Sequence, residues 1–209
     1  KWAERRRKLL LIAPATLRKQ WSQELEEKFS LPSMIMEAKS FNESKKVGVA
    51  NPFDLERASG KPAICICSYE FAARKEPELQ RIPWDLVVMD EAHKLRNVYK
   101  SDGAKTAKVL DNALMGVKKV LLSATPLQNS MLELYGLVSV IDPHFFGDLP
   151  SFKARYGRQQ LEQVELAMLR TRLSKVCNRT LRRQVQEEGG ISFTRRYSMT
   201  EDYRPSAQE

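Results

Sequence analysis

The chain has 209 residues, 42% of them hydrophobic, and a formal net charge of +9. This length suits one large domain or a domain with an appendage, and the hydrophobic content supports a full core and argues against wholesale disorder. No apolar run approaches the roughly 20 residues that a membrane-spanning helix needs, so no membrane partner is expected. The basic surplus favours a polyanionic partner, although charge alone also fits a basic domain without one.

The cysteines indicate a reducing, intracellular compartment, because the chain has three of them and shows no signal peptide. Cys65 and Cys67 stand two apart in an apolar run and therefore share one face of a predicted strand. We expect both to pack in the core. A zinc site at Cys65 and Cys67 would need further ligands, and the chain offers only Cys177 and two histidines besides them.

Strand-like and helix-like runs alternate along the first 122 residues, which predicts an α/β fold with a parallel sheet. A helix is predicted from an N-cap at Thr16 to Phe29, with Leu17, Trp21, Leu25 and Phe29 on its apolar stripe. Loop with one helical turn is predicted for 39–62, and a helix for 102–114. The predicted strands are 9–13, 34–36, 63–68, 85–89 and 117–122.

Beyond the fifth strand the pattern becomes helical. A helix is predicted at 131–141, a turn-rich break at 143–150 and an amphipathic helix at 159–176, followed by an extended segment at 191–198. We therefore divide the chain into an α/β lobe (1–129), a helical protrusion (130–190), and a strand with a linker (191–209).

The most informative motif is Asp90-Glu91-Ala92-His93, which directly follows the apolar run 85–89. A buried parallel strand that ends in two carboxylates presents them at the edge of the sheet where ligands bind. One carboxylate can hold Mg²⁺, usually through its waters, and the next can orient and deprotonate an attacking water. A second motif, Ser123-Ala124-Thr125-Pro126, ends the run 117–122 in the same way.

These motifs, in this order, resemble lobe one of the SWI/SNF helicase-like ATPases of superfamily two, which implies a RecA-like fold of the P-loop NTPase class. The matching segments are 13–17 with Trp21 (motif Ia), 67–70 (Ib), 90–93 (the DEAH motif), 123–129 (III), 132–147 (the helical insertion) and 180–183, before the linker to lobe two.

The resemblance implies an ATP- and Mg²⁺-dependent enzyme, with Asp90 as the magnesium residue and Glu91 as the general base. His93, Ser123 and Thr125 would couple the nucleotide site to neighbouring motifs; the two hydroxyls would do so by bonding to the DEAH loop. The implied nucleic-acid contacts are Thr16, Lys19, Ser68, Tyr69, Gln128 and Asn129. Thr16 as a plain N-cap, and Gln128 and Asn129 as caps of the next helix, stay open, and we expect Trp21 in the core.

One departure from the family pattern is the phosphate loop. The only Gly-Lys pair, Gly60-Lys61, precedes Pro62, so no Gly-Lys-Thr turn is present. We therefore interpret the chain as an excerpt that lacks motif I and lobe two and is inactive by itself. We also expect the sheet beside 117–122 either to leave a gap or to take another segment, for which 191–199 is a candidate.

The function implied by the resemblance is that of a DNA-dependent ATPase that translocates on double-stranded DNA and remodels protein–DNA complexes. Its partners would be duplex DNA, a DNA-bound protein complex and lobe two of the same protein. It would act at the nucleoid in a bacterial cytoplasm, or in a eukaryotic nucleus. The alternatives are an RNA helicase of the same superfamily and a non-catalytic scaffold that binds a protein partner.

Overall fold

The computed structural model describes residues 8–55, 64–101, 105–125, 130–158, 162–178 and 199. The chain divides into two compact units, Lys1–Glu162 and Gln163–Glu209. No helix in the described ranges is long and apolar enough to cross a membrane. The predicted division at 129/130 and 190/191 stays a prediction.

The first unit is built on a sheet of five parallel strands in the order β2-β3-β1-β4-β5. This confirms the predicted α/β class, and all five strands fall where apolar runs predicted them. The strands are β1 (Leu9–Ile12), β2 (Ser33–Ile35), β3 (Ile64–Cys67), β4 (Leu86–Met89) and β5 (Lys119–Leu121).

Helices follow most of the strands, as the crossovers of a parallel sheet require. In the first unit they are α1 (Arg18–Phe29), α2 (Ala38–Lys46), α4 (Tyr69–Arg74), α5 (Glu76–Gln80), the 3₁₀ helix η1 (Ala92–Leu95), α6 (Lys105–Ala113), α7 (Met131–Ile141) and α8 (Leu149–Tyr156). The second unit contains α9 (Gln163–Leu173).

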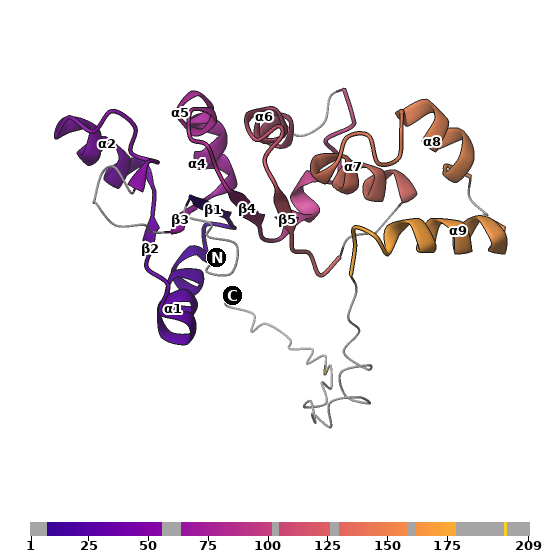
Figure 1. Cartoon of the computed structure of the whole chain (residues 1–209), viewed down its shortest axis with the longest axis horizontal. Coiled ribbons are helices and arrows are strands. Elements are labelled where there is room, and N and C mark those ends of the chain that lie inside the picture. Colours follow the sequence, from indigo (N-terminus) through magenta and orange to yellow (C-terminus); the bar gives the residue numbers. More distant parts are fainter. Residues whose placement is uncertain are drawn as a thin grey trace, which may run out of the picture. The chain divides into compact units, whose positions relative to one another are not determined.

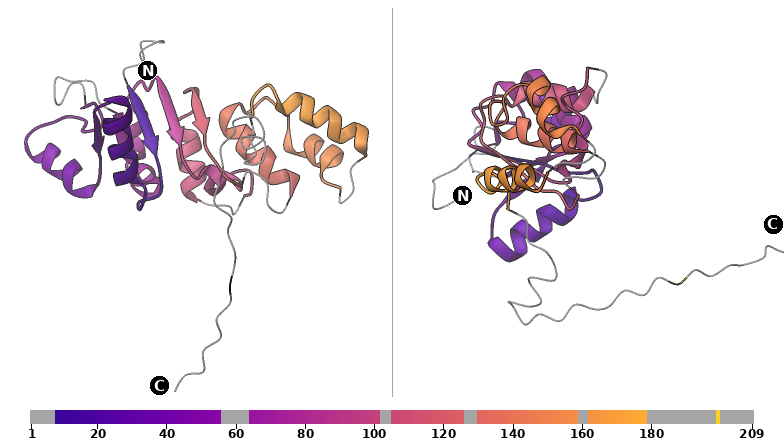
Figure 2. Two further views of the ribbon diagram at one scale, coloured as in Figure 1. Left: turned by 90° about the horizontal axis from the view of Figure 1, so that it is seen from below. Right: turned by 90° about the vertical axis from the view of Figure 1, so that its right-hand side faces the viewer.

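The two faces of the sheet are covered unequally. On one face, inward residues such as Leu10, Cys67 and Met89 join a large core with α2, α4, α5 and α6, and these helices lie on that side in Figure 1. The other face packs against α1 through Trp21 and Leu25. Leu86 and Val88 of β4 also pack on this face, whereas Val120 of β5 is 42% exposed. The left panel of Figure 2 shows α1 to one side of these two strands.

Strand β5 lies at the edge of the sheet. Among the described residues β4 is its sole strand partner, which agrees with the expected gap, whereas most of the proposed filler at 191–199 lies outside those residues. The backbone N–H of Leu122 donates to Met89 O (2.9 Å), and Ala92 N donates to Leu122 O (2.8 Å). The edge strand is thereby tied to the turn that follows β4.

Several helix predictions were wrong in detail. The N-cap of α1 is Leu17 without a side-chain bond, not Thr16. The segment predicted as loop contains the nine-residue α2, which has a capping box made by Glu37 and Ser40. Similarly, α8 begins within the predicted break, because Asp148 caps it and a proline fits the first turn.

Helices α6, α7 and α9 were predicted more closely, whereas no helix was predicted at α4, α5 or η1. Helix α7 has the predicted bounds, and α6 spans Lys105–Ala113 within the predicted 102–114. Helix α9 spans Gln163–Leu173, within the predicted 159–176, of which 159–161 lie outside the described residues. Its apolar residues are not all on one buried face, since Leu169 is buried but Val164 is exposed.

Candidate active site at the carboxyl end of β4

Asp90 is held by hydrogen bonds at every polar group. Its backbone N–H donates to Ile12 O (2.8 Å) on β1, and its carbonyl accepts from the Tyr69 hydroxyl (2.7 Å). Its carboxylate accepts from Glu91 N at Oδ1 (2.9 Å) and from the Trp21 indole at Oδ2 (2.8 Å). The carboxylate therefore has a defined direction at the end of the strand.

Tyr69 is suited to this fixed bond. Burial raises the pKa of its hydroxyl, and the carboxylates of Asp90, Glu91 and Glu70 raise it further. The hydroxyl consequently remains protonated and keeps donating to Asp90 O over the whole range in which the protein would work.

Glu91 has a left-handed backbone, with φ 51° and ψ 45°. A non-glycine residue rarely adopts this conformation, and such residues gather at functional sites. The conformation turns the chain sharply after β4, so that Glu91 stays half-buried while Ala92 is fully enclosed. The two carboxylates therefore have different surroundings, one fixed and one partly in solvent.

His93 lies beside Glu91. Its Nδ1 is 3.0 Å from Glu91 Oε2, and this buried nitrogen makes no hydrogen bond among the described residues. A small turn of either side chain would create the bond. The predicted coupling role of His93 thus has a plausible partner in Glu91.

The second motif reaches the first through the backbone. Ser123 is half-buried and its Oγ accepts from Thr125 N (3.2 Å), while Thr125 is exposed. Within the described ranges, neither hydroxyl bonds to the turn at 90–93; the link is the bond from Ala92 N to Leu122 O. Gln128 and Asn129 lie outside the described residues.

The proposed nucleic-acid residues fall into two groups. Thr16 and Lys19 are exposed around the start of α1, just past the carboxyl end of β1. Ser68 (7% exposed) accepts from Phe71 N as the N-cap of α4, and Tyr69 (1% exposed) donates to Asp90. The hydroxyls of Ser68 and Tyr69 are thus used inside the fold, and the geometry does not favour them as side-chain contacts to DNA.

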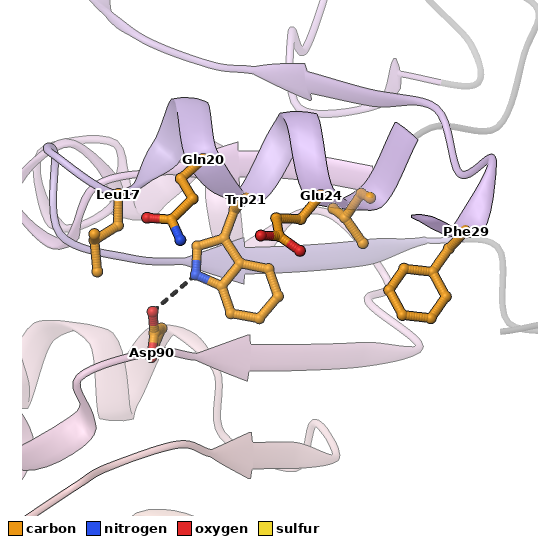
Figure 3. A pocket seen from close by; sticks show the side chains of 7 residues that line it. Leu17, Gln20, Trp21, Glu24, Phe29 and Asp90 are labelled. Carbon is orange, nitrogen blue, oxygen red and sulfur yellow. Dashed lines mark hydrogen bonds between the residues drawn. The ribbon is translucent and has the colours of Figure 1, made fainter. Parts of the chain in front are cut away.

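Sequence analysis missed the role of Trp21. The predicted core residue is half-buried: it packs beside the sheet, yet it also lines an open hollow of about 290 Å³ with Leu17, Gln20, Glu24, Leu25, Phe29 and Asp90 (Figure 3). Its indole N–H points out of the apolar stripe toward Asp90. Only the sheet order brings these residues together, since 69 positions separate them.

The residues present fit Mg²⁺ in part. Carboxylate oxygens at a half-buried edge are the hard ligands that Mg²⁺ takes, together with water and phosphate oxygens. Among the described residues no three His, Cys, Asp or Glu side chains are grouped to hold a metal by themselves. Asp90 and Glu91 would therefore complement a nucleotide-bound cation, and the sequence offers no Gly-Lys-Thr turn for the phosphates.

Comparison with known proteins gives a consistent result. Residues 1–208 match the SNF2-related domain family. The chain is 31% identical over 211 residues to a Bacillus subtilis protein named ATP-dependent helicase YqhH and described as uncharacterized, covering 97% of this chain and 32% of that protein. It is 30% identical over 190 residues to the RNA polymerase-associated protein RapA of Cronobacter sakazakii, covering 87% of this chain and 18% of RapA.

A solved structure shows the same fold. The SWI2/SNF2 ATPase core of Sulfolobus solfataricus, in complex with double-stranded DNA, matches with a TM-score of 0.59 and 18% identity over 83% of this chain and 34% of that one. The sheet is therefore of the RecA-like type. The chain spans about a third or less of its curated relatives. The family match and the order of its motifs show that this chain belongs to the SNF2-related domain family of superfamily-two helicase-like ATPases.

Proposed function

We propose that this chain is the first lobe of an ATP-hydrolysing motor that translocates on double-stranded DNA and remodels protein–DNA complexes. The observation that carries the proposal is the carboxylate pair at the end of β4, in which Asp90 is fixed by bonds from three separate segments. Phosphoryl transfer to water depends on positioning and electrostatics, and a fixed carboxylate next to a movable one supplies both.

The two carboxylates have different proposed roles. Bound Mg²⁺–ATP would supply the phosphoryl group and the cation that neutralises its charge. Asp90 would hold the cation through its water ligands. Glu91, half-buried at the turn, would orient the attacking water and accept its proton, while His93 at 3.0 Å limits where its carboxylate can move.

Duplex DNA is proposed as the polymer partner. Thr16 and Lys19 are exposed at the carboxyl edge of the sheet, where they suit contacts to phosphates that carry no sequence preference. Two similar proteins support this choice: one is an ATPase core in complex with double-stranded DNA, and the other is named as RNA polymerase-associated. Gln128 and Asn129 remain proposed contacts on the sequence motif alone, and lobe two of the same protein remains the proposed partner in catalysis.

The test uses the protein encoded by the complete reading frame that contains these residues. ATP turnover is measured with Mg²⁺, with and without duplex DNA or RNA. We expect stimulation by duplex DNA, and a loss of at least about 100-fold in Glu91→Gln, because general-base catalysis contributes that much or more. Glu43→Gln, an exposed acid on α2, is the matched control and should keep full turnover.

The alternatives give different outcomes. Stimulation by RNA and not by duplex DNA would favour an RNA helicase of the same superfamily. Absence of turnover in a protein with intact Asp90 and Glu91 would favour a scaffold that binds a protein partner.

A further inference from the structure

We propose that Trp21 is a positioning residue for the nucleotide-bound cation, because its indole N–H fixes the carboxylate of Asp90. This inference rests on the proposed role of Asp90 in holding that cation. The bond joins α1 to the end of β4 over 2.8 Å, between Nε1 of Trp21 and Oδ2 of Asp90 (Figure 3).

The bond from Trp21 completes the orientation of the carboxylate. Oδ1 of Asp90 accepts from Glu91 N, which belongs to the next residue and moves with it. A single bond at Oδ1 leaves the carboxylate free to swing about that contact. A second bond at Oδ2, from a helix that packs on the sheet, fixes the plane of the carboxylate relative to the fold.

The indole is chemically suited to this task. It only donates and carries no charge, so the full negative charge of Asp90 remains for a cation. A lysine or arginine at the same place would orient the carboxylate but neutralise it. Each carboxylate oxygen has two acceptor positions, so Oδ1 and Oδ2 can each still accept from a water of the cation.

Packing alone does not explain why a tryptophan stands here. Trp84 is a core tryptophan: it is 8% exposed and donates to Leu79 O (3.0 Å). Trp21 is only half-buried, and its ring borders the open hollow of about 290 Å³ instead of filling a core position. What distinguishes Trp21 from an apolar side chain on the same stripe is its N–H, which donates to Asp90.

Mg²⁺ depends on such outer partners because it demands near-ideal octahedral geometry. Replacing a residue that orients a metal ligand typically weakens metal binding by 10- to 100-fold. The expected signature of Trp21→Phe is therefore weaker cation binding in a chain that remains folded, since phenylalanine keeps an aromatic ring on α1 while it removes the donor.

The experiment uses the 209-residue chain, labelled with ¹⁵N, and Mn²⁺ as a paramagnetic probe for Mg²⁺. The amide signals of Glu91 and Ala92 are followed for broadening in the native chain, in Trp21→Phe and in Trp84→Phe. Trp84→Phe is the matched control, since it also removes one indole hydrogen bond, but one donated to Leu79 O inside the core. We expect Trp21→Phe to need about 10 to 100 times more Mn²⁺ for equal broadening, and Trp84→Phe to match the native chain.

A second measurement needs no variant of Trp21. The indole N–H of Trp21 should exchange slowly with solvent in the native chain and faster in Asp90→Ala, whereas the indole of Trp84 should be unchanged. Equal exchange of the Trp21 indole in both chains would overturn the inference even if Trp21→Phe failed to fold.

The remaining outcomes separate this inference from the proposed function. Equal Mn²⁺ dependence in Trp21→Phe and the native chain would overturn the positioning role and leave the proposed function intact. In the protein encoded by the complete reading frame, with ATP bound, a lack of broadening by Mn²⁺ at Glu91 and Ala92 would overturn both the positioning role and the cation role of Asp90.

Discussion

Gly136 shows how tightly α7 approaches the turn that carries the carboxylates. A Cβ atom on this residue would lie 2.1 Å from the carbonyl oxygen of Arg96 and 3.0 Å from the ring of Tyr99. Backbone atoms cannot move aside as a flexible side chain can. Only glycine therefore allows the helix to pack at this distance.

The first prediction is that Gly136→Ala destabilises the chain. In a helix interior, alanine normally makes a protein more stable than glycine does, by up to about 1 kcal/mol. A loss of stability in Gly136→Ala would therefore be due to the steric clash. We expect a loss of about 1–3 kcal/mol, the usual cost of overpacking, measured by urea denaturation. The control is Glu43→Ala at an exposed position of α2, where a change within about 0.5 kcal/mol is expected. An equal or greater stability of Gly136→Ala would contradict the close approach.

At the scale of elements, α7 is also joined to that turn by charge. Arg96 follows η1, and its Nη1 lies 3.5 Å from Oε2 of Glu133 in the first turn of α7. Both side chains are well enclosed, at 17% and 7% exposed. Arg96 Nε also donates to His93 O (3.0 Å), so the pair connects the helix with the DEAH turn itself.

The second prediction concerns this pair. Glu133→Gln keeps the shape of the side chain but removes the enclosed negative charge beside Arg96, and removing one partner of a buried pair costs about 3–5 kcal/mol. Glu70→Gln breaks the exposed pair with Lys94, 3.8 Å apart, and should cost at most about 1 kcal/mol. Equal free energies of unfolding for the two variants would show that the enclosed Arg96–Glu133 pair contributes no more to stability than the exposed pair.

The third prediction belongs to β3. Burial raises the pKa of the Cys67 thiol from 9.0 to about 12, and burial together with Cys67 raises the pKa of Cys65. Below pH 9 both the folded and the unfolded chain keep these protons. Above it the unfolded chain releases them first, so the free energy of unfolding should fall by up to about 1.4 kcal/mol per pH unit for each thiol.

Urea denaturation under reducing conditions at pH 8, 9 and 10 measures that fall. Cys67→Ala should make the decrease of the free energy of unfolding with pH shallower, whatever the variant's stability at pH 8. Cys177 is exposed in the folded chain, so Cys177→Ala is the matched control and should keep the native profile. If the free energy of unfolding of Cys67→Ala fell with pH as steeply as that of the native chain, the buried thiol would not be the cause of the fall.

At the scale of the whole molecule, the fourth prediction is that the 209-residue chain does not hydrolyse ATP. Its carboxylate pair has the position of a catalytic site, but its sequence contains no Gly-Lys-Thr turn to hold the phosphates. Phosphate release is measured with purified chain, Mg²⁺–ATP and duplex DNA. Turnover that Glu91→Gln abolishes would contradict the prediction.

The fifth prediction is weak binding of duplex DNA without sequence preference. The charge of +9 and the exposed residues after β1 favour contacts to phosphates, so affinity should fall steeply as salt rises. Lys19→Gln should lower the salt slope by about 1, since it removes one phosphate contact. Lys118 is exposed just before β5, at the amino edge of the sheet, and Lys118→Gln should leave the slope unchanged. Salt-independent binding would exclude a phosphate-dominated interface.

Some features of this protein could be predicted from local pattern alone. Buried parallel strands need apolar residues on both faces, so β1, β3 and β4 stand out as short continuous apolar runs. The positions of Asp90 and Ser123 directly after such runs then fix the edge of the sheet on which they lie. Helices with few apolar residues show no such pattern. Helix α2 has a single buried residue, Phe41, and its capping box lies in a polar segment, where it was not recognised.

The sequence by itself therefore determined the α/β class, the five strands and the carboxylates at the end of β4, because each depends on neighbours in the chain. The tertiary structure alone decided that Trp21 bonds to Asp90 and that the Tyr69 hydroxyl donates inside the fold. These features depend on the strand order, which places β1 between β3 and β4 and so brings three distant strand ends together. Many weak packing contacts across the whole sheet set that order, and no single segment encodes it.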